Sequence, residues 1–216
     1  MIDTHRHKGL RQQLVNELKR KGIQDPRILN AFLDIPRHYF LDKTFAEWAY
    51  KDVAFPIDAD QTISQPYTVA IQTSLLNLTK GDKVLEIGTG SGFQAAVISY
   101  LGAKVYTIER QKILFEKTEK FLHQLGYGQI RTLYGDGYQG APRFAPFDKI
   151  IITAGASEIP HQLIQQLNPG GIMVIPLGDD GDTQKMLRLT KKEDGSFIRE
   201  NFGNFKFVPF LKGVSV

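Results

Sequence analysis

Three glycines stand close together in a segment whose residue types could bind a nucleotide-like ligand. They are Gly88, Gly90 and Gly92, and they lie between an apolar run at residues 83–87 and a run of helical character at 92–101. Glycines allow a tight turn and let the backbone approach a ligand where a Cβ atom would clash. A strand, such a turn and a helix in succession are the context that a nucleotide-binding site requires.

Three carboxylates accompany this turn, each near the end of a successive predicted strand: Glu86, Glu109 and Asp136. Ligands of parallel sheets bind beyond the carboxyl ends of the strands, so these positions agree with a binding site. Glu86 disfavours a pyrophosphate and suits the cationic amino-acid end of S-adenosylmethionine (AdoMet). Glu109 can accept both ribose hydroxyls, and Asp136 is placed to reach the adenine amino group. Any one carboxylate alone would be read as a solvated strand end or a helix cap. The three together with the turn are typical of class I methyltransferases.

A dehydrogenase is the alternative that shares these features. Its dinucleotide motif has the spacing G-x-G-x-x-G, whereas here the spacing is G-x-G-x-G and Phe93 holds the later position. Tyr100 and Lys104 satisfy a Y-x-x-x-K pattern, but Gly102 and the strand that begins at Lys104 would break the helix that must carry both. The NAD hypothesis is therefore disfavoured.

The elements around the turn alternate between strand and helix. The apolar pattern predicts strands at 83–87, 104–108, 130–134, 149–153 and 171–177, and helices at 92–101, 111–125 and 160–167. Helices are also expected within 4–33, where Gly22 and Asp25-Pro26 separate two of them, and at 66–78. Short β-like runs at 185–190, 197–202 and 205–210 are separated by the hairpin signals Asp194-Gly195 and Gly203-Asn204. The fold class is thus α/β, a doubly wound Rossmann-like methyltransferase sheet, mostly parallel, with N-terminal helices and antiparallel C-terminal strands.

Length and composition fit a single domain at 1–216. It divides into an N-terminal helical and lid region (1–80), an AdoMet-binding core (81–180) and C-terminal strands (181–216). The 216 residues include no cysteine, and the five histidines lack an H-E-x-x-H spacing, so no metal is expected. The net charge of +4 is spread over short clusters, which favours solvated faces over a nucleic-acid groove. The absence of a long apolar stretch predicts a cytoplasmic protein without membrane partners, and we expect a monomer.

The segment Gln61-Thr62-Ile63-Ser64-Gln65-Pro66 lies just before the predicted core. A helix N-cap followed by Pro66 would explain only part of it. The whole string resembles the signature of the protein-L-isoaspartate O-methyltransferase family, whose active-site serine would correspond to Ser64. Further matches to the family are Ile35 to Phe40, Val84 to Gly92, Ile151 to Ala156, Leu167 to Gly171 and Phe207 to Phe210.

The resemblance implies methyl transfer from AdoMet to the α-carboxylate of L-isoaspartyl residues in damaged proteins or peptides, with S-adenosylhomocysteine as the second product. The methyl ester then cyclises to a succinimide, which begins repair. A carboxylate with a pKa of ~4 is already ionised at pH 7, so we expect Ser64 to orient it and not to attack. An extended substrate could pair with an exposed edge at Val208-Pro209-Phe210, although the proline there could equally just blunt a terminal strand.

Motifs and resemblance together predict three sets of site residues. The catalytic residue is Ser64. The cofactor-binding residues are Gln61, Thr62, Ile63, Ser64, Glu86, Gly88, Thr89, Gly90, Gly92, Glu109, Arg110, Asp136 and Gly137. The substrate-binding residues are Ser64, Gln65, Pro66, Val208, Pro209 and Phe210.

Two other functions share the AdoMet turn. One is a methyltransferase that acts on RNA or a small molecule, although an N-P-P-Y-like motif is missing from residues 153–156, which read Thr-Ala-Gly-Ala. The other is a module that binds AdoMet or a peptide without turnover, because fold alone never establishes chemistry.

Overall fold

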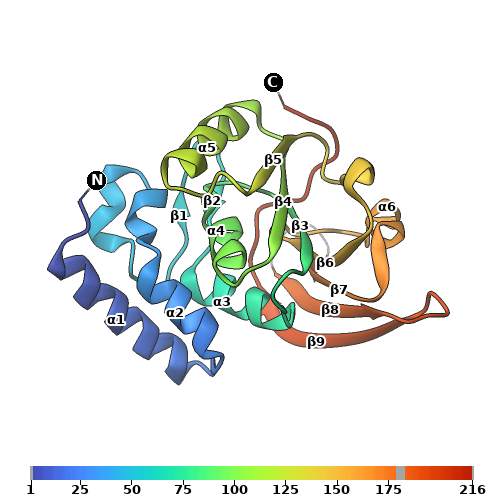
Figure 1. Cartoon of the computed structure of the whole chain (residues 1–216), viewed down its shortest axis with the longest axis horizontal. Coiled ribbons are helices and arrows are strands. Elements are labelled where there is room, and N and C mark those ends of the chain that lie inside the picture. Colours follow the sequence, from blue (N-terminus) through green and yellow to red (C-terminus); the bar gives the residue numbers. More distant parts are fainter. Residues whose placement is uncertain (1, 179–182, 216) are drawn as a thin grey trace.

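A seven-stranded sheet forms the centre of the computed structural model, which describes residues 2–178 and 183–215 (Figure 1). Its strands are β3 (Lys83–Ile87), β4 (Lys104–Glu109), β5 (Arg131–Tyr134), β6 (Phe147–Ile152), β7 (Leu167–Leu177), β8 (Gln184–Lys191) and β9 (Phe197–Phe205). They are ordered β5-β4-β3-β6-β7-β8-β9. The pairs from β5 to β7 are parallel and the last two are antiparallel, which confirms the predicted fold class.

Helices surround this sheet and also precede it. They are α1 (His5–Arg20), α2 (Pro26–Asp34), α3 (Pro66–Leu75), α4 (Phe93–Tyr100), α5 (Lys112–Gln124) and α6 (His161–Gln165). Short 3-10 helices follow α2 as η1 (Arg37–Phe40) and η2 (Lys43–Trp48), and η3 (Pro142–Phe144) lies later. A small antiparallel hairpin joins β1 (Phe55–Pro56) to β2 (Thr62–Ile63), and the sequence pattern did not predict it. The helix boundaries follow local chemistry, since Thr4 and Asp25 cap α1 and α2 and Pro66 opens α3.

Alternation along the strands produces a core on each side of the sheet. Val84 and Val105 face the larger core, which the N-terminal helices share with α4 and part of α5. Leu85 and Ile108 face the opposite core, where Leu163 of α6 packs. Strands buried on both faces read as nearly continuous apolar runs, which is why their positions could be predicted well.

The sheet has its switch point at the carboxyl end of β3. The chain leaves β3 for β4 and then β5 on one side, and it returns to pair β6 on the other side. Ile87 lies level with Ile108 of β4 and Ile152 of β6, so the loops that follow these strands open at one edge. A crevice for a ligand is expected at such a point.

The prediction of two separate strands at 197–202 and 205–210 is wrong. β9 runs through Gly203-Asn204 to Phe205, and β8 pairs with it on both sides of this dipeptide. Gly203 has φ +95°, the Asn201 side chain accepts its N–H at 3.1 Å, and the β8–β9 register shifts between Lys185 and Leu187. The glycine therefore marks a bulge in one strand and not a hairpin. The hairpin expected at Asp194-Gly195 is confirmed, because it joins β8 to β9.

Smaller differences concern element lengths. β7 begins at Leu167 instead of at 171, because a register shift beside β6 accommodates Gly170, whose φ is +74°. The helix from Pro66 ends at Leu75, three residues before the predicted end at 78. Tyr100 ends α4 and Lys104 begins β4, so the two do not share a helix face.

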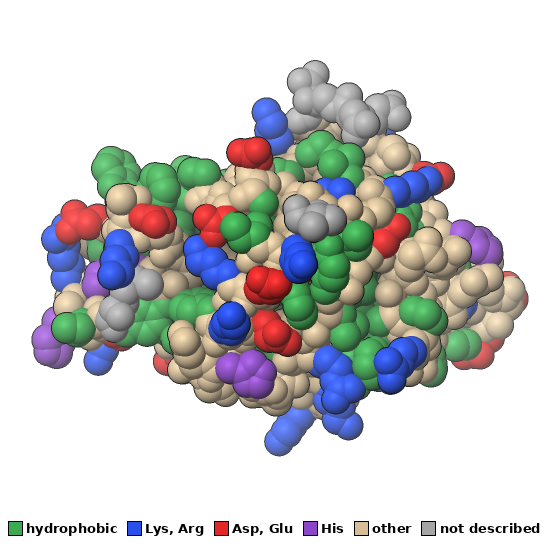
Figure 2. Space-filling model, turned by 90° about the horizontal axis from the view of Figure 1, so that it is seen from above, with side chains coloured by type: hydrophobic (Ala, Val, Ile, Leu, Met, Phe, Trp, Pro, Cys, Tyr) green, Lys and Arg blue, Asp and Glu red, His purple; other side chains and the backbone are tan. Residues whose placement is uncertain are grey.

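The surface carries charges of both signs. Figure 2 shows basic and acidic side chains interspersed with apolar ones on the face that it draws. Within residues 2–178 and 183–215, no helix combines the length and the apolar character that a membrane crossing needs.

Candidate functional site

The glycine turn after β3 has a conformation that few other residues could adopt. Gly88, Gly90 and Gly92 have φ values of +95°, +51° and +83°. A Cβ atom on Gly88 would lie 2.5 Å from Thr153 Oγ1, and one on Gly92 would lie 2.9 Å from Thr118 Cγ2. Gly88 is therefore needed for close contact with Thr153, directly after β6, and Gly92 for packing of the turn against α5.

Glu109 reaches from the end of β4 to the turn. Its Oε2 accepts the Gly90 N–H at 2.9 Å, and its Oε1 accepts the Gln111 N–H at 2.9 Å. Each carboxylate oxygen has a further lone pair, so Glu109 can still accept hydroxyl groups of a ligand. The contacts fix the carboxylate at the edge of the turn.

A cavity, here called the turn cavity, opens beside these groups. It is lined by Gln61, Thr62, Ile87, Gly88, Gly90, Ile108, Glu109, Arg110, Gly137, Thr153, Ala154, Val208, Pro209, Phe210 and Leu211. The structure thus brings together seven predicted cofactor-binding residues, which are Gln61, Thr62, Gly88, Gly90, Glu109, Arg110 and Gly137. It adds Val208, Pro209 and Phe210, which the sequence placed with the substrate.

The other predicted cofactor residues lie behind the wall or beside it. Glu86 is fully buried, and neither carboxylate oxygen has a hydrogen-bond partner among the described residues. Burial raises the pKa of Glu86 to about 8, so the side chain is mostly protonated at pH 7. The Thr89 hydroxyl bonds to that of Thr107 at 2.7 Å, and Asp136 Oδ1 accepts the Tyr138 N–H at 2.9 Å. Ile63 is buried on β2.

A second cavity, here called the serine cavity, adjoins the first. It is lined by Ala54, Thr62, Ser64, Gln65, Thr68, Thr153, Lys206, Phe207 and Val208. Thr62, Thr153 and Val208 line both cavities, so the two cavities meet at these residues. Pro66, a predicted substrate residue, is buried at the start of α3 instead.

Ser64 lies between β2 and α3 at the wall of the serine cavity. Its carbonyl accepts a hydrogen bond from Arg37 Nη2 at 2.8 Å, and its hydroxyl bonds to no residue that the structure describes. The backbone is therefore fixed while the hydroxyl is available to a ligand.

The segment after β9 crosses the carboxyl ends of the strands. Val208 C=O accepts the Gly155 N–H, and Phe210 N–H donates to Gly155 C=O, both at 2.8 Å. The Phe210 ring stacks on Tyr138 with centroids 4.1 Å apart. Residues 208–210 are thus paired on one side with the loop after β6 and lie outside the seven-stranded sheet. The sequence pattern had instead suggested a strand at the edge of that sheet.

Several residues at the site escaped the sequence analysis. Thr153 donates through Oγ1 to the carbonyls of Ile87 and Gly88 at 2.9 and 2.8 Å, which ties β6 to the turn. Its place directly after β6, at the switch point, was the signal that could have identified it. Lys206 of the serine cavity gave no such signal, and neither did Arg37, which bonds to the Ser64 carbonyl, because single basic residues usually lie on the surface.

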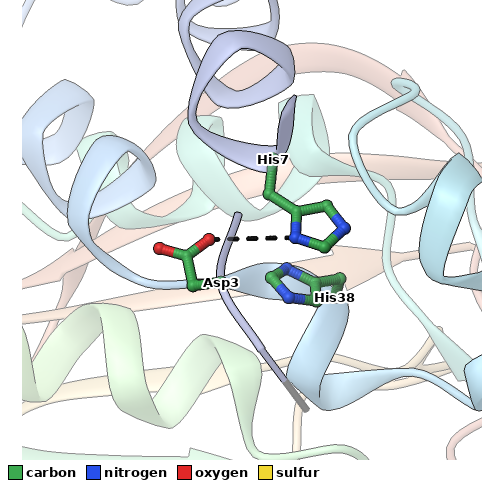
Figure 3. A group of neighbouring side chains, drawn as sticks. All are labelled: Asp3, His7 and His38. Carbon is green, nitrogen blue, oxygen red and sulfur yellow. Dashed lines mark ion pairs between the residues drawn. The ribbon is translucent and has the colours of Figure 1, made fainter. Parts of the chain in front are cut away.

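A separate cluster of Asp3, His7 and His38 joins the N-terminus to η1 (Figure 3). The two imidazole rings stack with centroids 3.9 Å apart and planes at 28°, so lone pairs in those planes do not converge on one point. Both Asp3 oxygens accept from Arg11 at 2.8 Å, and His7 Nδ1 belongs to the cap of α1. This arrangement is that of a packed, hydrogen-bonded anchor and not of a ligand set.

The turn cavity fits AdoMet in chemical terms. It offers backbone groups at a glycine turn, acceptors at Glu109, and apolar walls from Ile87, Ile108 and Ala154 for an aromatic base. The unpartnered carboxyl of Glu86 lies under the same turn.

Comparison with known proteins decides the family. The model of the family described as protein-L-isoaspartate(D-aspartate) O-methyltransferase matches residues 9–215. The chain belongs to this family. It is 56% identical over 212 residues to the protein-L-isoaspartate O-methyltransferase of Christiangramia forsetii, covering 98% of this chain and 99% of that protein. It is 49% identical to that of Dictyoglomus thermophilum, with 98% and 95% covered.

Solved structures of the family agree. One named protein-L-isoaspartate O-methyltransferase superposes with a TM-score of 0.83 at 31% identity, over 92% of this chain and 65% of that longer chain. A β-aspartate methyltransferase of Plasmodium falciparum, in complex with S-adenosyl-L-homocysteine, gives a TM-score of 0.81 at 25% identity over 98% of this chain and 100% of that one. The family resemblance and the methyltransferase fold expected from the sequence are both confirmed.

Proposed function

We propose that this chain transfers the methyl group of AdoMet to the α-carboxylate of L-isoaspartyl residues in damaged proteins or peptides, and so begins repair through a succinimide. The observation that carries the proposal is the pair of adjoining cavities in a chain of this family, one beside the glycine turn and one beside Ser64. A donor in the turn cavity and an acceptor in the serine cavity would meet where Thr62, Thr153 and Val208 line both.

We assign the cofactor to the turn cavity. Glu109 would accept the ribose hydroxyls, Gly137 and Asp136 would border the adenine, and Gly88 and Gly90 would lie along the amino-acid end. Glu86 would act from beneath the turn, where the cationic amino group of the cofactor would favour its ionised form. Gln61, Thr62, Ile63, Thr89, Gly92 and Arg110 complete the proposed set. When bound, AdoMet supplies a methyl group on a positively charged sulfur.

Ser64 would orient the acceptor. Its hydroxyl can donate to one carboxylate oxygen and leave the other oxygen directed toward the turn cavity. The acceptor is ionised at neutral pH, so no general base is needed, and alignment supplies the catalysis. Gln65, Pro66, Val208, Pro209 and Phe210 are the further residues that we assign to the substrate side.

A methylation assay tests this function. The protein is incubated with tritiated AdoMet and with matched peptides that contain either isoaspartate or aspartate, and base-labile methyl ester is counted. Label on the isoaspartyl peptide alone is the expected result. Equal labelling of both peptides, or none, would reject the assignment.

The remaining expectations stay predictions. A monomer would be recognised by sedimentation equilibrium, and the cytoplasmic location by fractionation of cells that produce the chain. Binding of nucleic acid is not expected, and a gel-shift assay checks that expectation.

A further inference from the structure

Arg37 carries a guanidinium group in the interior of the protein, next to the serine cavity. The side chain is 1% exposed and is among the largest fully buried ones. Nε donates to the Ala49 carbonyl at 3.0 Å, and Nη2 donates to the Ser64 carbonyl at 2.8 Å. Burial lowers the pKa of Arg37 to about 9, so the group is still charged at neutral pH.

The contacts of Arg37 join the two halves of the proposed site. Its Cζ lies 4.8 Å from the ring centroid of Phe93, the first residue of α4 after the glycine turn. The guanidinium plane thus has the start of α4 on one side and the Ser64 carbonyl at its tip. A shift of Arg37 would change the position of Ser64 relative to the turn.

Asp52 holds the chain at Tyr67, on the other side of Gln65-Pro66 from Ser64. Its Oδ1 accepts the Tyr67 N–H at 2.7 Å, and its negative charge favours the charged form of Arg37. Arg37 and Asp52 therefore fix the backbone on both sides of Gln65-Pro66, one through a carbonyl and the other through an N–H.

Stability alone is a poor explanation for this arginine. A buried charge is costly to desolvate, and Arg37 Nη1 has no hydrogen-bond partner among the described residues. An apolar side chain of similar volume would fill the space without that cost. A guanidinium, however, has a rigid planar fork that fixes two acceptors at set positions.

We propose that Arg37 is a positioning residue for methyl transfer, which sets the Ser64 hydroxyl relative to the turn cavity through the Ser64 carbonyl and the face of Phe93. The inference rests on the proposed role of Ser64. Misplacement of a reacting group by ~1 Å can lower a rate about a hundredfold, so a contact to the backbone of Ser64 is sufficient for a large effect.

The test compares Arg37→Met and Arg37→Lys with the unaltered protein. Assays use an isoaspartyl peptide and AdoMet, and calorimetry with S-adenosylhomocysteine gives its Kd and the fraction of sites that bind. We expect kcat per binding site to fall at least about tenfold in Arg37→Met and less in Arg37→Lys, because lysine keeps the charge and one donor. The peptide KM and the Kd should stay within about twofold, because the groups proposed to contact the ligands remain.

Arg11 provides a matched control. It is also a buried arginine, 4% exposed and bonded to Asp3 and Tyr50, but, unlike Arg37, it bonds to no residue that lines the serine cavity. Arg11→Met should lower the melting temperature and leave kcat per binding site unchanged. Equal losses of kcat in Arg11→Met and Arg37→Met would overturn the proposal.

A double-mutant cycle separates positioning from general damage. If Arg37 acts through Ser64, Arg37→Lys should lower kcat much less in a Ser64→Ala background than in the unaltered protein. Additive losses contradict the inference, and so does loss of S-adenosylhomocysteine binding in both Arg37 variants, which would indicate a purely structural role. An unaltered protein that methylates no isoaspartyl peptide would instead contradict the proposed function.

Discussion

Ser64 has a backbone fixed by Arg37 and a hydroxyl without a bonded partner among the described residues. A change to the hydroxyl should therefore affect the orientation of the acceptor carboxylate and not the binding of AdoMet. Because the carbonyl is bonded to Arg37, removal of the hydroxyl should leave the local chain in place. Ser64→Ala is therefore expected to lower kcat about tenfold to a hundredfold, the range for a lost orienting donor, with an AdoMet Kd close to that of the unaltered protein. Ser74→Ala, on α3 and outside both cavities, is the control. An unchanged kcat in Ser64→Ala would reject the orienting role.

Glu86 is a buried acid whose protonation state should depend on the cofactor. Its pKa of about 8 in the free protein means that it holds a proton at pH 7. A cation placed nearby lowers the pKa of a carboxyl group, so binding of AdoMet should release a proton.

Calorimetry of AdoMet binding at pH 7 in buffers of different ionisation enthalpy measures that release. We expect the observed enthalpy to vary with the buffer for the unaltered protein and to be independent of it in Glu86→Gln. A buffer-dependent enthalpy of the same size in both proteins would show that the proton comes from another group. Glu86→Gln should fold normally, since it replaces a neutral acid with a neutral amide.

At the scale of elements, the turn after β5 is tightly enclosed. A Cβ atom on Gly137 would lie 2.4 Å from Ile87 Cγ2 and 2.9 Å from Phe210 Cε2. Gly137→Ala should therefore displace the segment that carries Phe210, which lines the turn cavity. Because this overpacking moves a wall of the cofactor site, the Kd for AdoMet should rise at least about tenfold. Gly135→Ala is a close control, because its Cβ would meet only Ile108 Cγ2 at 3.9 Å. Similar Kd values for the two variants would contradict this account.

Elements were predictable from the sequence where burial imposes a simple pattern. β3 matches the expected bounds, and β4 extends only one residue beyond them, because both strands are apolar on two faces. The glycine turn and Glu109 could be predicted as site residues because they directly follow these two apolar strands. The run at 205–210 was mistaken for a strand of its own, because only Phe205 belongs to β9, whereas Phe210 packs on Gly137 and Tyr138 across the strand ends.

Other parts of the site have no local signature. The Arg37 contact to Ser64 joins residues 27 positions apart through an irregular segment, and no periodicity announces it. The short hairpin of β1 and β2 has only two residues in each strand, too few for alternation to be recognised. Such contacts depend on tertiary packing and become visible only in three dimensions.

At the scale of the whole molecule, the N-terminal helices are joined to the rest by the anchor around His38. His38 Nδ1 lies 2.6 Å from the Tyr50 hydroxyl, and the ring packs on His7, with Asp3 and Arg11 alongside. Burial, followed by electrostatic repulsion from His7, lowers the pKa of His38 from 6.5 to about 4. The neutral form is thus the one that the folded protein accommodates.

This shift predicts how stability depends on pH. Between pH 6.5 and about 4 the unfolded chain binds a proton at this position that the folded chain does not, so the free energy of unfolding should fall as the pH is lowered through that range. Urea unfolding at several pH values measures the slope. In His38→Gln, the free energy of unfolding should fall less steeply as the pH is lowered. His161 is an exposed histidine on α6, and His161→Gln should keep the slope of the unaltered protein. A slope unchanged by His38→Gln would refute the assignment.

The walls of the turn cavity come from distant parts of the chain, with Gln61 and Thr62 on one side and residues 208–211 on the other. All strands of the central sheet precede the second of these segments in the sequence. During synthesis, the sheet can therefore be complete while the ligand site still lacks a wall. Tight retention of AdoMet should then appear only after residues 208–211 have reached Gly155, which makes ligand binding a reporter of the last stage of folding and not of sheet formation.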